Sequence, residues 1–360
     1  MPSQGSCVSK ARVLAQSNKA AGEKLTTRTE NKFLMIGIIG AGIVGSRVAE
    51  SLVADSSLSL LVFDSSKVVA QRLARRLSRS GKEISAVSKE QIDSAKVVVL
   101  AGPAPHAVLA RELIEKKISV VSTSDDISDC TNLLALDDLA KMNQVVLIVG
   151  AASSPGMSGL LARSMYKSFD SVDEVHIALH GTGGPACARQ HHRALAGQSI
   201  GWHEGEWLRR PGGSGRELCW FPEPVGAYDC YRGELPDPLL IKHAFPELSR
   251  VTARVSATRR DRIFARLPQL IPPQSEGGMG GLRVEVRGNK NGERIVDVVG
   301  VVERVGQVAG VVSGCVARLI NSREITDVGA FVLGDTNLPN SVLLSQIVAS
   351  GIQIHAFVRA

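Results

Sequence analysis

Apolar and polar positions between residues 33 and 150 follow a repeating order. Short, almost wholly apolar runs predict buried strands, and stretches with apolar residues at helical spacing predict amphipathic helices. The predicted strands are 33–39, 58–63, 97–100, 118–122 and 145–149, and the predicted helices are 46–53, 68–77, 105–116 and 131–142. Strands that alternate with helices in this way favour a doubly wound parallel sheet.

The pattern changes after residue 165. Strand signals recur at 172–180, 250–256 and 282–287, and the turn residues 289–292 join the last of these to 294–302 as a hairpin. These strands predict a mixed or antiparallel sheet. The long segment 181–249 lacks a clear period, so we expect a loop-rich insertion that covers or lines a pocket.

Glycines follow the first predicted strand with the spacing Gly40-x-Gly42-x-x-Gly45. The first glycine permits a tight turn, the second lets the backbone approach a pyrophosphate, and the third lets the helix pack closely on the strand. The next strand ends at Asp64, where a carboxylate would bind the adenine-ribose hydroxyls. The pattern predicts NAD, while Ser65, Ser66 and Lys67 keep NADP open as the alternative.

Ligands of a parallel sheet lie beyond the carboxyl ends of its strands, which brings three further loops near the cofactor. The expected cofactor-binding residues are Gly40, Ala41, Gly42, Ile43, Val44, Gly45, Asp64, Ser65, Gly102, Pro103, Thr123, Ser124, Pro155 and Gly156. Two candidates for catalysis lie in the same loops. His106 would donate to the substrate or cap a helix, and Asp125, with Asp126, would handle protons or cap a helix.

The expected fold class is α/β, with an N-terminal doubly wound parallel (Rossmann) sheet and a second α+β domain built on a mixed or antiparallel sheet. We expect a disordered tail at 1–32, of which residues 1–30 should be dispensable. The dinucleotide-binding domain would comprise 33–165 and a returning segment of about 306–360. Residues 166–305 would form the substrate and dimerisation domain.

Charge and composition exclude several classes of protein. The net charge is +7, but six Lys or Arg lie in residues 1–34, and aromatic residues make up only 4%. Neither feature favours nucleic-acid binding. The six cysteines contain no C-x-x-C pair, so we expect no metal site, reduced thiols and a cytoplasmic location. No apolar run is long enough to cross a membrane.

Other residues of the second half are candidates for substrate binding and packing. Arg189, Arg193 and Arg232 could hold substrate carboxylates through their planar guanidinium groups, or could be ordinary surface arginines. His180, His191, His192 and His203 could transfer protons. Gly306, Gly310 and Gly314 recur on one helical face and predict close packing of a helix on the sheet.

The loops that carry His106, Thr123-Ser124 and Pro155-Gly156, together with the three glycines, resemble the saccharopine dehydrogenase family over about residues 35–165. Three positions differ. Asp125 and Ser154 replace a tyrosine and an aspartate of the family's motifs, and the tyrosine of the first motif has no counterpart. The resemblance implies hydride transfer between a nicotinamide and a C–N bond. The expected substrate is a carboxylate-bearing amino compound, and the expected partner is a second copy of the chain.

Two alternatives stay open at this point. Loss of the family's tyrosine and aspartate would suit an NAD-binding regulator without catalysis. Cys130, in the sequence Asp129-Cys130-Thr131-Asn132, would suit a cysteine-dependent aldehyde dehydrogenase if a histidine activated it.

Overall fold

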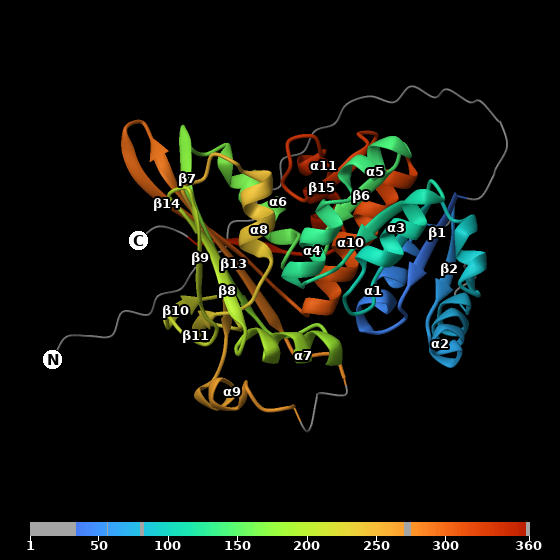
Figure 1. Cartoon of the computed structure of the whole chain (residues 1–360), viewed down its shortest axis with the longest axis horizontal. Coiled ribbons are helices and arrows are strands. Elements are labelled where there is room, and N and C mark those ends of the chain that lie inside the picture. The colour runs from blue at the N-terminus through green and yellow to red at the C-terminus, as the bar shows by residue number, and fades with distance from the viewer. Residues whose placement is uncertain (1–33, 56, 80–82, 270–274, 358–360) are drawn as a thin grey trace.

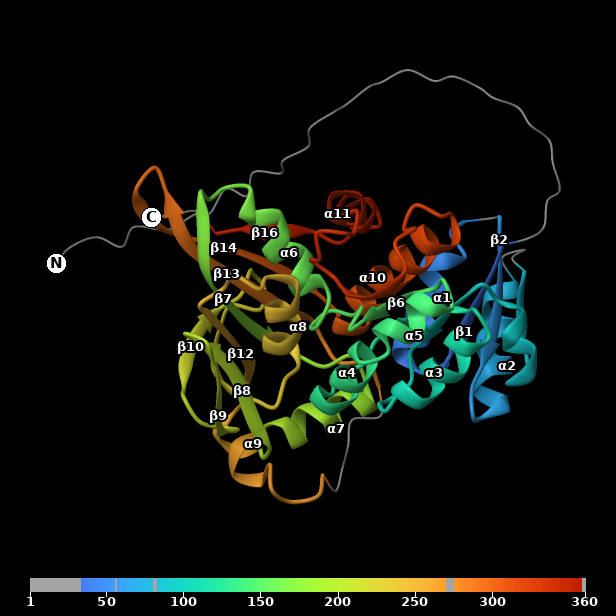
Figure 2. The same cartoon turned by 45° about the horizontal axis from the view of Figure 1, so that its top comes forward.

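The computed structural model describes residues 34–55, 57–79, 83–269 and 275–357. The predicted tail at 1–32 lies outside these ranges. Two sheets lie on opposite sides of the molecule, and helix α10 (Val305–Asn321) runs between the second sheet and helix α1 (Ile43–Leu52) (Figures 1 and 2).

The first sheet has seven strands within the described residues, in the order β15-β6-β5-β4-β1-β2-β3, and all of its pairs are parallel. Every residue of β4, β5 and β6 is buried, as expected for a parallel sheet covered on both faces. The doubly wound parallel sheet is confirmed. Its strands are β1 (Leu34–Ile39), β2 (Leu58–Phe63), β3 (Ile84–Ala86), β4 (Val97–Leu100), β5 (Ser119–Ser122), β6 (Val146–Val149) and β15 (Gly329–Val332).

The largest difference from the predicted helices of this half lies at residues 131–142. The single helix expected at 131–142 is wrong: α4 (Ile127–Leu134) begins earlier, because the Asp126 side chain accepts a hydrogen bond from the Asp129 N–H, and α5 (Asp137–Met142) is separate. The remaining helices are α2 (Lys67–Ser78), the 3₁₀ turn η1 (Glu90–Ser94), α3 (Ala107–Glu115) and α6 (Met157–Tyr166).

The second sheet contains the order β10-β11-β12-β7-β13-β14-β16, with β8 and β9 attached through β12. β12 pairs with β7 in parallel and the other pairs are antiparallel, so the expected mixed sheet is confirmed. Its strands are β7 (Ser171–His180), β8 (Gln198–His203), β9 (Glu206–Pro211), β10 (Glu217–Trp220), β11 (Ala227–Arg232), β12 (Arg250–Ser256), β13 (Gly280–Lys290), β14 (Glu293–Glu303) and β16 (Ile354–Ala356).

The predicted β13–β14 hairpin is present, with a tighter turn than 289–292. Asn289 and Lys290 pair with the opposite strand, and only Asn291 and Gly292 remain in the loop. Both have positive φ, 52° and 80°, which is the conformation that two-residue hairpin turns require.

Segment 181–249 is not loop-rich, contrary to expectation. It contains α7 (Pro185–Ala194), the four strands β8 to β11, and α8 (Asp237–Ala244). β9 has no buried residue, so its sequence shows no alternation of apolar and polar positions. The short helix α9 (Arg259–Phe264) follows β12.

The glycines of α10 face another helix rather than the sheet, which corrects the sequence interpretation. A Cβ atom on Gly310 would lie 2.4 Å from the Arg47 Cβ, and one on Gly314 would lie 2.7 Å from the Ser51 Oγ, both on α1. After α10 the chain contributes β15 to the first sheet, then α11 (Asn340–Ala349), then β16 to the second sheet.

One hydrophobic cluster of buried residues spans both sheets. It includes Ile36 and Val98 of the first sheet together with Val175 and Val284 of the second. Within the described ranges, no helix is both long and apolar enough to cross a membrane.

Candidate functional site

The three glycines after β1 have three different surroundings. Gly40 has φ +99°, a conformation that favours glycine, and a Cβ on Gly45 would lie 1.8 Å from the Gly40 carbonyl oxygen. A Cβ on Gly42 would meet no protein atom within 4 Å. Packing therefore demands glycine at the first and third positions, whereas the second borders open space at the N-terminus of α1, where a pyrophosphate would bind.

Asp64 connects this loop to the end of β2. Its Oδ2 accepts a hydrogen bond from the Ala41 N–H at 2.7 Å, and its Oδ1 accepts one from the Ser66 N–H at 2.8 Å. The carboxylate is thus fixed beside the glycine loop, and each oxygen keeps a further lone pair for a ribose hydroxyl. Ser65 next to it is exposed.

The strand order reverses between β1 and β4, which makes this the point where a parallel sheet opens a crevice for a ligand. Gly40 lies against the loop after β4, since a Cβ on Gly40 would be 2.6 Å from the Gly102 nitrogen. Gly102 itself borders open space, and Pro103 beside it is exposed.

His106 is a buried bridge between two of the loops. Its side chain is 4% exposed, with Nδ1 2.8 Å from the Ser122 Oγ and Nε2 2.9 Å from the Gly102 carbonyl oxygen. The buried Asp129 carboxylate accepts from the backbone N–H groups of His106 and Ala107, so it caps α3 in place of the His106 side chain. The capping role predicted for the His106 side chain is wrong, and its role towards a substrate stays a prediction, with His106 not among the pocket-lining residues.

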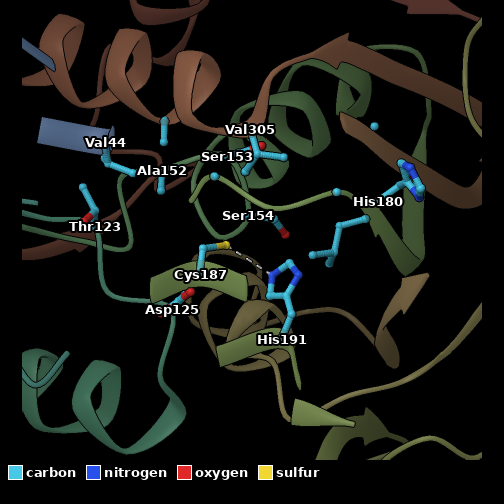
Figure 3. Close-up of a pocket in the computed structure, with 15 residues that line it drawn as sticks. Val44, Thr123, Asp125, Ala152, Ser153, Ser154, His180, Cys187, His191 and Val305 are labelled. Carbon is cyan, nitrogen blue, oxygen red and sulfur yellow. Dashed lines mark hydrogen bonds between the residues drawn. The ribbon is translucent and has the colours of Figure 1, made fainter. Parts of the chain in front are cut away.

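A pocket lies where the glycine loop, the loop after β5, the loop after β6 and the second sheet meet (Figure 3). The backbone of Gly184, just before α7, is close to the glycine loop, since a Cβ there would lie 2.9 Å from the Ile43 Cγ1. The polar side chains that line the pocket are Thr123, Asp125, Ser153, Ser154, His180, Cys187 and His191.

Asp125, Cys187 and His191 form one titratable group of the pocket, and His180 is a further titratable side chain in its lining. Cys187 and His191 lie one turn apart on α7, with Sγ 3.7 Å from Nε2, and Figure 3 shows Asp125 beside Cys187. Burial raises the pKa of Asp125 and lowers that of His191, and each charge acts on the other. Burial also raises the pKa of Cys187 to about 12, so this side chain is a neutral thiol. Asp126, by contrast, is a helix cap.

Ser154 connects the pocket to a buried carboxylate that sequence analysis missed. Asp237, at the start of α8, is 1% exposed, and its Oδ1 accepts from the Ser154 and Ser158 hydroxyls, both at 2.7 Å. Burial raises the pKa of Asp237. Pro155 and Gly156 line a second cavity together with Asp237, and Ser124 is buried, so none of these three predicted residues is in the lining of the first pocket.

The three candidate arginines lie elsewhere. Arg189 and Arg193 are exposed on α7, and Arg232 is half-buried on β11, with none of them among the pocket-lining residues. His180 does line the pocket, where it stacks on Tyr228 with ring centroids 4.0 Å apart and its Nδ1 is 2.8 Å from the Ser256 Oγ.

Cys130 does not suit a nucleophile. It is fully buried, its thiol donates to the Ser124 carbonyl oxygen at 3.5 Å, and burial raises its pKa. The structure therefore gives no support to the aldehyde dehydrogenase alternative at this residue. No group of three or more potential metal ligands gathers in the described part of the chain.

This parallel sheet with its glycine crevice, joined to a mixed sheet, is a fold that solved dehydrogenase structures share. In particular, the fold is similar to that of apo saccharopine dehydrogenase (L-Glu forming) from Saccharomyces cerevisiae, with a TM-score of 0.69, 14% identity, and coverage of 90% of this chain and 100% of that one. C. glutamicum DAP dehydrogenase in complex with DAP gives a TM-score of 0.51 and 14% identity, with 88% and 98% covered. No family model and no curated protein matches the sequence. The predicted resemblance to saccharopine dehydrogenase is thus confirmed for the fold.

Proposed function

We propose that the chain is an oxidoreductase that transfers hydride between NAD(H) and a C–N bond of an amino compound. Gly42 carries the proposal, because its open surroundings leave room for a ligand at the N-terminus of a helix beside the strand-order reversal. The glycine loop would hold the pyrophosphate and Asp64 the adenine ribose, which favours NAD over NADP.

The bound nicotinamide would accept or donate the hydride. In the oxidative direction a substrate C–H bond breaks with both electrons leaving, and the nitrogen lone pair forms the C=N bond. The proton on that nitrogen must first pass to a base. Asp125 is a candidate for this base because its carboxyl lines the pocket, and His191 is a candidate partner because its charge acts on that of Asp125.

A carboxylate on the substrate stays a prediction from the family resemblance. The positions of Arg189 and Arg193 give it no support, because both side chains are exposed away from the pocket lining. A substrate defined by its amine is enough for the chemistry proposed here.

The test has two stages. NADH and NADPH are titrated into the protein by cofactor fluorescence, and mixtures of amines with carbonyl compounds are then screened for loss of the absorbance of the reduced cofactor. We expect NADH to bind more tightly, and Asp125→Asn to lower turnover by about 10²–10⁴-fold without weakening NADH binding. Absence of cofactor binding would refute the proposal. NADH binding without any turnover would instead favour the NAD-binding regulator.

A further inference from the structure

Two of the three hydroxyl groups in the pocket lining, those of Thr123 and Ser154, donate their protons away from the pocket. The Thr123 Oγ–H donates to the Leu100 carbonyl oxygen at 3.0 Å, and the Ser154 Oγ–H donates to the Asp237 Oδ1 at 2.7 Å. A hydroxyl has one proton and two lone pairs. Both groups therefore offer only lone pairs to a molecule in the pocket.

Asp237 fixes the direction of the Ser154 hydroxyl from behind. Its Oδ1 accepts the protons of both Ser154 and Ser158, and the residue is 1% exposed. The Ser154 proton is therefore directed to Asp237, and the lone pairs of the Ser154 oxygen remain for a molecule in the pocket.

Asp125 adds an acceptor from the loop after the neighbouring strand. Its carboxyl group lines the same pocket as Thr123 and Ser154, and Figure 3 shows the side chains of Asp125, Ser154 and His191 around one part of it. Asp125 and Ser154 follow the adjacent parallel strands β5 and β6, so two loops at one edge of the sheet supply acceptors to the same pocket.

From this arrangement we propose that the pocket recognises the protonated nitrogen of an aliphatic amine, with Thr123, Asp125 and Ser154 accepting its N–H groups. The inference rests on the proposed function, because the nitrogen so held is the one whose C–N bond would react. An ammonium group has donors and no acceptor, which matches the acceptors that Thr123, Asp125 and Ser154 offer. The substrate class is thus defined by an amine rather than by a carboxylate.

The experiment compares five-carbon ligands that differ only in their end groups: 1,5-diaminopentane, 1,5-pentanediol and glutarate. Each is titrated by calorimetry into the full chain saturated with NADH, so that the amine cannot be oxidised. We expect the diamine to bind at least about tenfold more tightly than the diol, and glutarate to bind most weakly.

Three variants locate the binding. Asp125→Asn and Ser154→Ala should each weaken diamine binding by about tenfold or more while leaving NADH affinity unchanged. Asp126→Asn is the matched control: it removes the same charge one residue along, and asparagine also caps a helix. This control should change diamine affinity by less than about threefold.

Three outcomes would overturn the inference: glutarate binding as tightly as the diamine, no binding by any of these ligands, or equal losses in Asp125→Asn and Asp126→Asn. Each of these leaves the proposed function standing if NADH still binds and a carboxylate-bearing amine is turned over. Loss of NADH binding in the unmodified chain would refute the proposed function itself, so the two failures can be told apart.

Discussion

Gly42 and Gly45 are close in sequence but should respond differently to the same substitution. Gly42→Ala adds a methyl group that meets no protein atom, at φ −68°, so the melting temperature should stay unchanged. NADH affinity should fall by about tenfold or more, about 1.4 kcal/mol, because the methyl blocks the pyrophosphate.

Gly45→Ala is the contrasting variant, because its methyl would lie 1.8 Å from a backbone oxygen and should lower stability instead. Thermal melts and cofactor titrations of both variants separate the two effects. Equal NADH affinity in Gly42→Ala and the unmodified chain would contradict the assigned pyrophosphate site.

His106 makes stability depend on pH. Burial lowers the pKa of His106 from its ordinary value of 6.5, so the unfolded chain binds a proton more readily than the folded one. Its contribution to stability is full above about pH 6.5 and is lost as the pH falls towards the lowered pKa.

His106→Gln should lower the free energy of unfolding by about 1–3 kcal/mol, because buried hydrogen bonds are lost. The decrease in this free energy between about pH 8 and about pH 5.5 should also become smaller than in the unmodified chain. Denaturant titrations at several pH values measure both effects. Some slope should remain, because burial also lowers the pKa of His176, His180 and His191. An unchanged slope would show that His106 does not stay neutral.

Asp125 should make amine binding depend on pH. Its pKa is raised mainly by burial, with further contributions from Asp126 and Asp237, while the charge of His191 opposes them. Because a cation favours the ionised carboxylate, diamine affinity should decrease as the pH falls through this raised pKa, with uptake of a proton by Asp125. In Asp125→Asn the same titration should be flatter, and an identical pH dependence would assign the effect to another group.

At the scale of elements, the contact between α1 and α10 should tolerate no side chain at its centre. In Gly310→Ala the new methyl would lie 2.4 Å from the Arg47 Cβ and 2.5 Å from the Arg47 backbone carbon, so the helices must separate. We expect the free energy of unfolding to fall by about 1–3 kcal/mol. Gln307→Ala on the same helix is the control and should change the free energy of unfolding by less than about 0.5 kcal/mol. A neutral Gly310→Ala would contradict the close contact.

The sequence predicts the strands whose residues are buried in a regular pattern along their whole length. It misses strands that are very short or exposed. β2, β4 and β12 have the predicted bounds because the apolar runs or the alternation begin and end with the strand. β3 is only three residues long, and β9 is exposed along its length, so neither has a hydrophobic signal. The start of α4 had a signal, Asp126 followed by Asp129, that a stricter search for helix caps would find.

For the whole molecule, the continuous core predicts cooperative unfolding of both sheets. Trp202, Trp207 and Trp220 all lie on strands of the second sheet, so tryptophan fluorescence reports on that sheet, whereas far-UV circular dichroism reports on both. The two signals should give the same melting midpoint. Separate midpoints would show that the sheets unfold independently despite their shared core.

The site could be predicted only where its residues follow a strand of the first sheet. Gly42, Asp64, Thr123 and Asp125 were identifiable, because the carboxyl ends of parallel strands meet at one edge. Ser154 and Asp237 come together through the packing of α8 against the loop after β6, which no local pattern encodes. On α7 the sequence favours the arginines for their charge and names His191 as well, and the helix turns its Cys187 and His191 face to the pocket.

The late position of α10 and β15 in the chain has a consequence for synthesis on the ribosome. β15 pairs with β6, and α10 covers α1, yet both follow the whole second sheet except β16 in sequence. Apart from β15, the first sheet is synthesised before the second. Until residue 332 has been translated, its strand β6 has no β15 to pair with, and α1 is not covered by α10 until that helix has been made. During that interval the nascent chain exposes an unpaired strand edge and an apolar helix face. A chaperone that covered these two surfaces would prevent aggregation most effectively in this period.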